Sequence, residues 1–282
     1  MYNLRYHIAS LVAVFLALAI GLLLGTIVVE RGVLDRQRTT LVKSLQTDFT
    51  GMKKENEELR RDRDREHAFA QDAVPTLIAG MLRGKSVLII TNAGRNDGLS
   101  VTRDTLRAAG ADSVVATFKS KDFGRGEPGG QDALTGIATR TPGVAGANDP
   151  VVAALADEWS KRGLPQPLTD QLRSAGQVSI EGSSTEIAPD AVVLLASFDG
   201  SADPALVSLV AAMQKTGTAA AGVESQGVAT GVADAALGAG LSTVDDVDRP
   251  EGMVSLVYVL AGRAEGHFGV KSGATTLYPK LR

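Results

Sequence analysis

The 282-residue chain is close to neutral and has no cysteine, with 29 Lys and Arg residues against 32 Asp and Glu residues. The lack of Cys excludes disulfide bonds, thiolate metal sites and thiol catalysis. Without a basic excess, and with only 4% aromatic residues, the composition gives no indication of nucleic-acid binding. The length allows one sizeable domain, or two smaller ones, beside a membrane anchor.

The first predicted element is a membrane-spanning helix from Ile8 to Val29. It has no charged side chain, and Ser10 and Thr26 are its only polar residues. At about 1.5 Å per residue, such a helix is long enough for a bilayer core of about 30 Å. Residues 17–19 have the small-x-small form of a signal-peptide cleavage site, but cleavage there would leave an apolar N-terminus. We therefore expect an uncleaved anchor rather than a signal peptide or a buried helix.

The charges that flank this anchor leave its orientation open. One basic residue, Arg5, precedes it. Four basic residues follow it closely: Arg31, Arg36, Arg38 and Lys43. The positive-inside rule would place the C-terminal part in the cytoplasm, but the rule weakens before a long domain. Gly21 and Gly25 form a GxxxG pattern, which is a weak indication of helix pairing because Gly is common in membrane helices.

A charged helix is predicted to follow as a stalk over residues 31–74. Segment 53–66 is almost entirely charged with mixed signs, which is typical of a solvated helix. One heptad register places six residues on a short seam: Val42, Leu45, Phe49, Met52, Asn56 and Leu59. Asn at an a position favours a parallel two-stranded pairing, which two membrane anchors would also impose. We expect a coiled coil that forms a parallel homodimer; the alternative is a single solvated helix.

Residues 75–282 are predicted to form an α/β domain. Predicted strands at 86–91 and 113–118 flank a helix at 99–109. This βαβ pattern recurs over residues 191–223, with a helix at 204–215 that has Pro204 in its first turn. We therefore expect a doubly wound, Rossmann-like parallel sheet. Further helices are predicted at 150–162, 167–175, 228–237 and 250–263, and one edge strand in the tail after residue 266. Pro75 and Gly80 are expected to end the stalk, and residues 119–150 to form long surface connections.

Motifs for catalysis or cofactor binding are not found in the sequence. The loop after the first strand carries Gly94 and Gly98 but no G-x-G-x-x-G pattern, and no P-loop or nucleophile elbow occurs. The three histidines, at positions 7, 67 and 267, are far apart, and the five methionines are scattered. The sequence therefore predicts neither an enzyme, nor a bound cofactor, nor a cluster of soft metal ligands.

Two groups of carboxylates lie in the predicted loops. Asp199 and Asp203 follow the strand at 191–196, where we expect them to end a strand and cap a helix. Asp245, Asp246 and Asp248 form the densest carboxylate cluster outside the stalk. They fit a capping turn before the next helix, a surface that faces a protein partner, or a site for a hard cation such as Ca²⁺ or Mg²⁺. We keep them as a candidate partner surface.

Three segments, with the Gly-rich tail around His267, carry a family resemblance: NLRYHIASLVAVFLALAIGLLLGT at 3–26, LRGKSVLII at 82–90 and LSTVDDVD at 241–248. They resemble the actinobacterial MctB-type copper transport protein family. The resemblance implies a single-anchor plasma-membrane protein with a coiled coil, an exported α/β domain and a link to copper tolerance in mycobacteria. Related SteB-like proteins act in cell separation, where they pair with a second membrane protein to control a peptidoglycan hydrolase.

Three functions follow as hypotheses. The resemblance implies a copper-homeostasis or efflux factor, although no copper ligand can be carried over and a single span would need partner subunits for transport. The stalk and anchor favour a scaffold that binds another membrane or envelope protein. An exported hydrolase would have to use loop carboxylates such as Asp199 or Asp245, which is the least supported of the three.

Overall fold

The structure is a computed structural model that describes residues 4–93, 98–142, 144, 146–183, 185–198, 201–228 and 231–281, without the side chains of residues 28–37, 197, 198 and 201. The chain divides into two compact units, Met1–Glu66 and His67–Arg282. The first is wholly helical in its described part, and the second contains the α/β domain.

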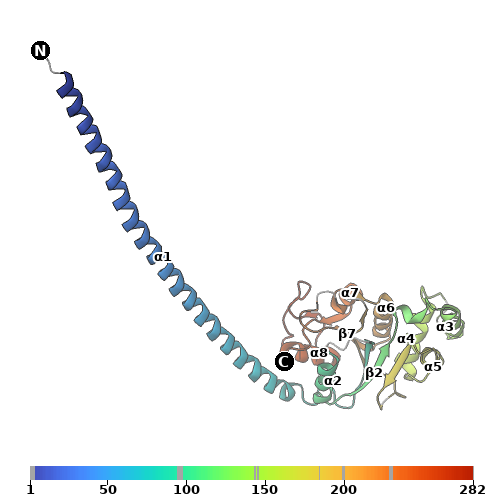
Figure 1. Ribbon diagram of the computed structural model, residues 1–282. Coiled ribbons are helices and arrows are strands. Elements are labelled where there is room, and N and C mark those ends of the chain that lie inside the picture. The colour runs from blue at the N-terminus through green and yellow to red at the C-terminus, as the bar shows by residue number, and fades with distance from the viewer. Residues whose placement is uncertain are drawn as a thin grey trace. The chain divides into compact units, whose positions relative to one another are not determined.

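Helix α1 (Leu4–Ile78) runs from the first described residue through the whole stalk region (Figure 1). It continues through Pro75 and ends at Ile78, between the two residues that were expected to mark the end of the stalk, Pro75 and Gly80. A proline inside a helix removes one backbone hydrogen bond. Val74 and Ile78 are buried on either side of it, and this packing outweighs the local preference. The turn after α1 contains Gly80, whose φ of 72° is left-handed.

The domain is built on a seven-stranded sheet in the order β3-β2-β1-β4-β7-β8-β9. Its strands are β1 (Ser86–Asn92), β2 (Asp112–Phe118), β3 (Val178–Glu181), β4 (Ala191–Leu194), β7 (Ala219–Val223), β8 (Ser242–Val244) and β9 (His267–Phe268). All neighbouring pairs are parallel except β2 and β3. The strand order changes direction between β1 and β4, since β2 lies on one side of β1 and β4 on the other.

The remaining elements connect these strands. They are α2 (Leu99–Ala108), the 3₁₀ helix η1 (Lys121–Gly124), α3 (Gly130–Ala138), α4 (Pro150–Arg162), α5 (Pro167–Ser174), the hairpin β5 (Ser197–Phe198) with β6 (Ser201–Ala202), α6 (Pro204–Lys215), α7 (Val232–Gly238) and α8 (Pro250–Leu260). The expectation of surface connections over 119–150 was partly wrong. Helix α3 lies there and buries Leu134 and Ala138, so this segment adds to the core.

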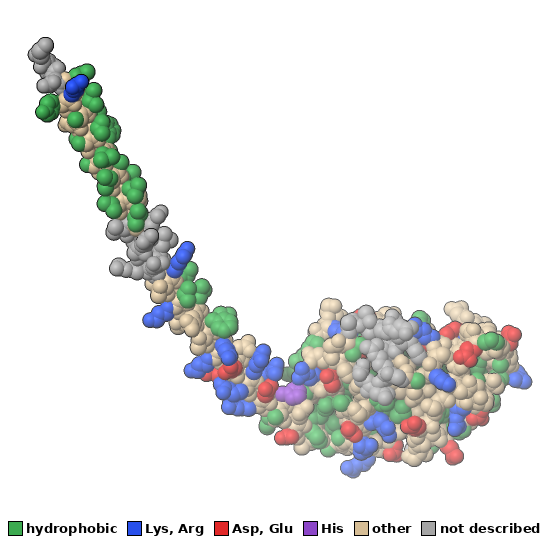
Figure 2. Space-filling model, viewed as in Figure 1, with side chains coloured by type: hydrophobic (Ala, Val, Ile, Leu, Met, Phe, Trp, Pro, Cys, Tyr) green, Lys and Arg blue, Asp and Glu red, His purple; other side chains and the backbone are tan. Residues whose placement is uncertain are grey.

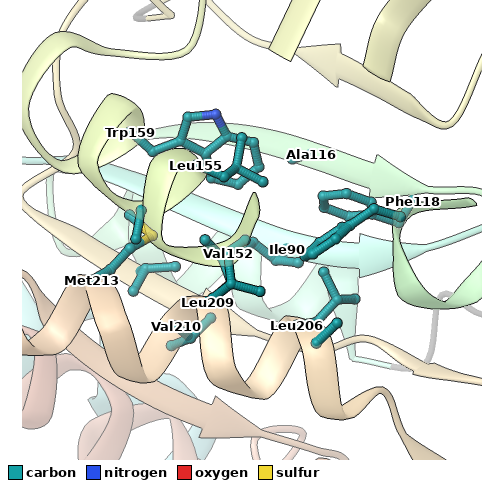
Figure 3. Close-up of a cluster of buried hydrophobic side chains, with 14 of the residues drawn as sticks. Ile90, Ala116, Phe118, Val152, Leu155, Trp159, Leu206, Leu209, Val210 and Met213 are labelled. Atoms are coloured by element: carbon teal, nitrogen blue, oxygen red, sulfur yellow. The ribbon is translucent and has the colours of Figure 1, made fainter. Parts of the chain in front are cut away.

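Helices cover both faces of the sheet, because successive side chains of a strand point to opposite faces. Leu88 and Ile90 of β1 belong to the core cluster that contains α3 to α7. Val87 and Ile89 belong to the other cluster, with the end of α1, α2 and α8. In the first cluster, α4 and α6 meet over the strands, and Trp159 is fully buried (Figure 3). Its Nε1 donates a 2.7 Å hydrogen bond to Oγ1 of Thr169, which satisfies the buried indole.

The last crossover differs from the one before it. The connections β7–α7–β8 and β8–α8–β9 step in the same direction across the sheet. Helix α7 lies in the core cluster of α6, whereas α8 lies on the opposite face with α2. The two connections therefore have opposite hands, and parallel crossovers of mixed hand are uncommon. Because β7, β8 and β9 are parallel, the start of α8 and the C-terminal tail lie at the same end of the sheet as the loop after β7.

Candidate functional site

The described chain has one helix long and apolar enough to cross a membrane, over Leu4–Ile27, with 24 residues and a mean hydropathy of 2.7. None of this segment is buried, and Figure 2 shows hydrophobic side chains around it. The predicted span, Ile8 to Val29, agrees with it as far as Ile27. The side chain of Val29 lies outside the described residues. The chain therefore carries an N-terminal helix suited to anchoring it.

The predicted seam of the stalk is exposed along its length. Its members all lie on α1 with their side chains open to solvent: Val42, Leu45, Phe49, Met52, Asn56 and Leu59. Beside them, Lys53 and Glu57 form an i,i+4 ion pair at 4.0 Å, as expected of a solvated helix surface. These exposed residues, apolar except for Asn56, are available to pack against a second helix. The coiled coil itself remains a prediction.

An acidic corner lies just past the carboxyl ends of β7 and β8, and we define it as Glu224, Asp245, Asp246 and Asp248. The loops are joined by backbone hydrogen bonds: the N–H of Glu224 donates to the carbonyl of Val244 at 2.9 Å, and the N–H of Val247 to the carbonyl of Glu224 at 3.0 Å. Loops that follow neighbouring parallel strands meet at one edge of the sheet, which is where ligands bind in open α/β folds. This edge is therefore the first place to look for a site.

Asp245 holds the C-terminal tail. Its side chain is buried, and its carboxylate accepts hydrogen bonds from the backbone N–H of Val270 at 2.8 Å and of Lys271 at 3.1 Å. A Cβ at Gly269 would lie 2.1 Å from Oδ1 of Asp245, and the φ of Gly269 is 131°, so this position requires glycine. Asp245 therefore fixes the C-terminal tail to the loop after β8 through these two hydrogen bonds.

Asp246 is fully buried, and neither of its carboxyl oxygens has a hydrogen-bond partner. It lies beside the first turn of α8, where a Cβ on Gly252 would be 2.5 Å from its Oδ1. Burial raises the pKa of Asp246 to about 7, and the negative charges of Asp245 and Glu251 add to the rise. A carboxyl in this setting changes its charge close to neutral pH.

The predicted partner surface is contradicted at two of its three residues. Asp245 and Asp246 are buried, because one carboxylate turns inward to the tail and the other to α8. Asp248 is partly exposed, and its carboxylate accepts a 2.6 Å hydrogen bond from the backbone N–H of Gln226. Only Asp248 remains available to a partner.

A buried ion pair at this corner was not predicted from the sequence. Lys271 Nζ pairs with Oε1 of Glu224, and Oε2 of Glu224 accepts a 3.2 Å hydrogen bond from the N–H of Ala233. A Cβ on Gly231 would overlap the Glu224 carboxylate, so Gly231 makes room for it. Glu224 could have been found from its position directly after a buried strand. Lys271 gives no signal in the sequence, since it lies in an irregular tail.

Asp203 caps α6 as predicted, with Oδ1 accepting a 2.9 Å hydrogen bond from the N–H of Ala205. Its Oδ2 also accepts a 2.7 Å bond from the N–H of Asp122. Asp122 and Phe123 have positive φ values of 53° and 57°, which few residues other than glycine adopt. Asp203 therefore stabilises a strained turn as well as a helix. Asp199 and Gly94 lie outside the described residues.

Imidazole and carboxylate side chains do not form a metal site in the part of the chain that the structure describes. No group of three or more His, Asp or Glu side chains there could hold a metal ion. His267 lies in β9 with its Nδ1 3.2 Å from Oγ1 of Thr243, while His67 lies on α1. Met213 is buried in the core between α6 and its neighbours. The acidic corner does not support a site for a hard cation either. The carboxylates of Glu224, Asp245 and Asp248 accept backbone hydrogen bonds, and Asp246 is buried beside α8.

The comparisons with known proteins give one consistent result. A family model described as "Copper transport outer membrane protein, MctB" matches residues 1–279. Two relatives named "Copper transporter MctB", from Mycobacterium bovis and Mycobacterium tuberculosis (strain H37Rv), are each 24% identical over 315 aligned residues, covering 98% of this chain and 99% of the relative. No solved structure matches the chain. Since the family model covers nearly the whole sequence, the chain belongs to the MctB family of copper transport proteins.

Proposed function

We propose that the chain is a single-pass plasma-membrane protein that takes part in copper homeostasis or efflux through an exported α/β domain. Family membership carries the link to copper. The exposed apolar helix at the N-terminus supports a membrane anchor, and the domain that follows is a folded unit in its own right. In this proposal, the domain regulates or assembles a copper pathway rather than conducting the ion.

The chemistry of the donor residues supports an indirect role. Copper(I) is bound by Cys and Met sulfur and by imidazole. The chain has no Cys, three His that are far apart and five Met that are scattered in the sequence, and among the described residues no group of three or more His, Asp or Glu could hold a metal ion. A second membrane or envelope protein would therefore supply the ligands. We also propose that the domain is not an enzyme, since Asp203 and Asp245 accept backbone hydrogen bonds that fix structure.

The proposed location is the plasma membrane, with the domain on the extracytoplasmic side. The family description names the outer membrane. Proteins that span that kind of membrane are closed antiparallel barrels, whereas the described sheet is mostly parallel with helices on both faces. An apolar helix suits the plasma membrane better. Orientation follows from the family resemblance and not from the flanking charges.

Two finer features complete the proposal. The exposed seam between Val42 and Leu59 supports a parallel coiled-coil homodimer. The reversal of strand order between β1 and β4, with helices on both faces, supports a doubly wound, Rossmann-like domain.

A gene deletion tests the copper role directly. The deletion strain, the complemented strain and the parent are grown under mild copper load, and cell-associated copper is measured by mass spectrometry, with zinc as the control metal. We expect copper to rise several-fold in the deletion strain, to return to the parental level on complementation, and zinc to stay constant. Unchanged copper would overturn the proposal.

A second candidate is a SteB-like scaffold in cell separation, with no copper binding of its own. It is favoured by the combination of an anchor, a long stalk and a described domain in which no group of three or more His, Asp or Glu could hold a metal ion. Here the deletion strain would have normal copper but would separate poorly after division, and cross-linking in cells would capture a membrane partner that controls a peptidoglycan hydrolase.

A further inference from the structure

An open apolar groove lies in the α/β unit where the last turns of α1 meet α8 and the C-terminal tail. Its volume is about 470 Å³, and Glu251 is the one charged residue among those that line it. The α1 side is formed by Phe69, Ala70, Ala73 and Leu77, together with Val74. The tail contributes Tyr278.

The groove is rich in exposed apolar surface. Phe69 is 77% exposed, Leu77 is 53% exposed and Tyr278 is 51% exposed. Scattered exposed apolar residues are ordinary on a protein surface, but a contiguous patch of this kind marks an interaction site. Small side chains, Ala70 and Ala73, leave the groove open beside the projecting ring of Phe69.

The heptad register of the stalk indicates what fills the groove. Counting on in sevens from Val42 places Ala70 and Leu77 at a positions and Ala73 at a d position. These are the residues that would face a second helix in a parallel pair, and all three line the groove. The same count places Phe69 at g, a flanking position at the edge of the seam in a parallel dimer, whereas Val74 at the e position is buried against its own domain.

We propose that the groove is a self-association site, occupied by the α1 base of a second copy of this chain. In the symmetric pair, Phe69 of each copy packs against the open alanine positions of the other, Ala70 and Ala73. The interface extends the dimer beyond the seam that ends at Leu59, past the charged segment 60–66, to the domain itself. This inference rests on the parallel homodimer of the proposed function.

The charged segment explains why two separate contacts are needed. Its a and d positions are Arg63 and Glu66, which are exposed and cannot form an apolar seam. Arg63 pairs with Asp64 on its own helix at 2.8 Å, so its charge is directed to the helix surface. Apolar contacts on both sides of this segment would fix the orientation of the two domains relative to each other. The stalk seam alone would leave that orientation variable.

Thiol cross-linking tests this inference, because the natural chain contains no cysteine. Single-cysteine variants of the full chain are placed in membranes and treated with a short bismaleimide. Ala73→Cys reports on the groove, Ala68→Cys is a matched control at the outward f position, and Leu45→Cys reports on the stalk seam. We expect dimers from Ala73→Cys and Leu45→Cys, and about tenfold fewer from Ala68→Cys because the f position faces away from the partner.

A second substitution examines the role of Phe69. Phe69→Ser in the Ala73→Cys background should lower the cross-linked dimer about fivefold, the effect of losing an aromatic anchor. The same change in the Leu45→Cys background should leave the stalk cross-link intact. Ile187→Ser, which removes another exposed apolar side chain, is the control and should change neither.

The outcomes separate the inference from the dimer on which it rests. If Leu45→Cys gives dimers but Ala73→Cys gives no more than Ala68→Cys, the groove is not a self-association site and the stalk dimer stands. A cross-link from Ala73→Cys to a protein of another size, without a dimer, also overturns self-occupancy. If neither position gives dimers, the homodimer itself is wrong.

Discussion

The buried Asp246 gives the sharpest quantitative prediction. The pKa of this carboxyl rises from 3.8 to about 7, mainly because of burial. Between those two pH values the unfolded chain releases the proton while the folded chain keeps it, so stability falls as pH rises through this window. Each pKa unit corresponds to about 1.4 kcal/mol. Above pH 7 the charged Asp246 therefore lowers the free energy of unfolding by roughly 4 kcal/mol.

Asp246→Asn removes this titration and keeps the side-chain shape. We expect the variant to match the natural chain near pH 4 and to be more stable by roughly 4 kcal/mol at pH 8, with the difference growing mostly between these values. Urea unfolding of the full chain in detergent measures the free energy, with the fluorescence of Trp159 as the probe. This is the one tryptophan in the sequence, and it is fully buried.

The matched control is Asp72→Asn, which removes an exposed carboxylate from α1. A surface change of this kind should alter stability by less than about 0.5 kcal/mol. A stability difference for Asp246→Asn that does not depend on pH, or a variant that is less stable at pH 8, would refute the reasoning.

Three further predictions concern the packing of the domain. Gly269→Ala should cost roughly 2–4 kcal/mol in urea unfolding, because its Cβ would lie 2.1 Å from the carboxylate of Asp245. Thr169→Val should cost roughly 1–3 kcal/mol in the same assay, since it leaves the buried Nε1 of Trp159 without its acceptor. Pro75→Ala should stabilise α1 by roughly 1–3 kcal/mol, seen as a higher melting temperature by circular dichroism, because it restores a helix hydrogen bond.

Features set by local periodicity were predictable from the sequence. The apolar run from Ile8, the charged stalk and the strands at 86–91 and 113–118 each depend on residues close together in the chain. Helices at 150–162 and 204–215 were found with their boundaries, because a proline in the first turn marks where each begins. The family resemblance was also visible in three short segments and is confirmed by the family model.

Features that depend on distant contacts were not predictable. Pro75 is a helix breaker by local preference, yet α1 passes through it because Val74 and Ile78 are buried on the domain. Strand β3 gives only a weak local pattern, and its antiparallel pairing with β2 forms the edge of the sheet. Helix α8 packs on the same face of the sheet as α2, and no local sequence pattern indicates which face of the sheet a helix will cover.

The acidic corner shows most clearly which features are set by the local sequence and which are set by tertiary contacts. The sequence by itself determined that Asp245, Asp246 and Asp248 follow a buried strand and precede a helix that begins at Pro250. Only the tertiary structure decided which way the carboxylates turn, because the tail that binds Asp245 arrives from about 25 residues further along. Burial of a charge is a property of everything packed around it. A cluster predicted to face a partner therefore lies, for two of its members, in the interior, where Asp245 binds the tail and Asp246 is buried without a hydrogen-bond partner.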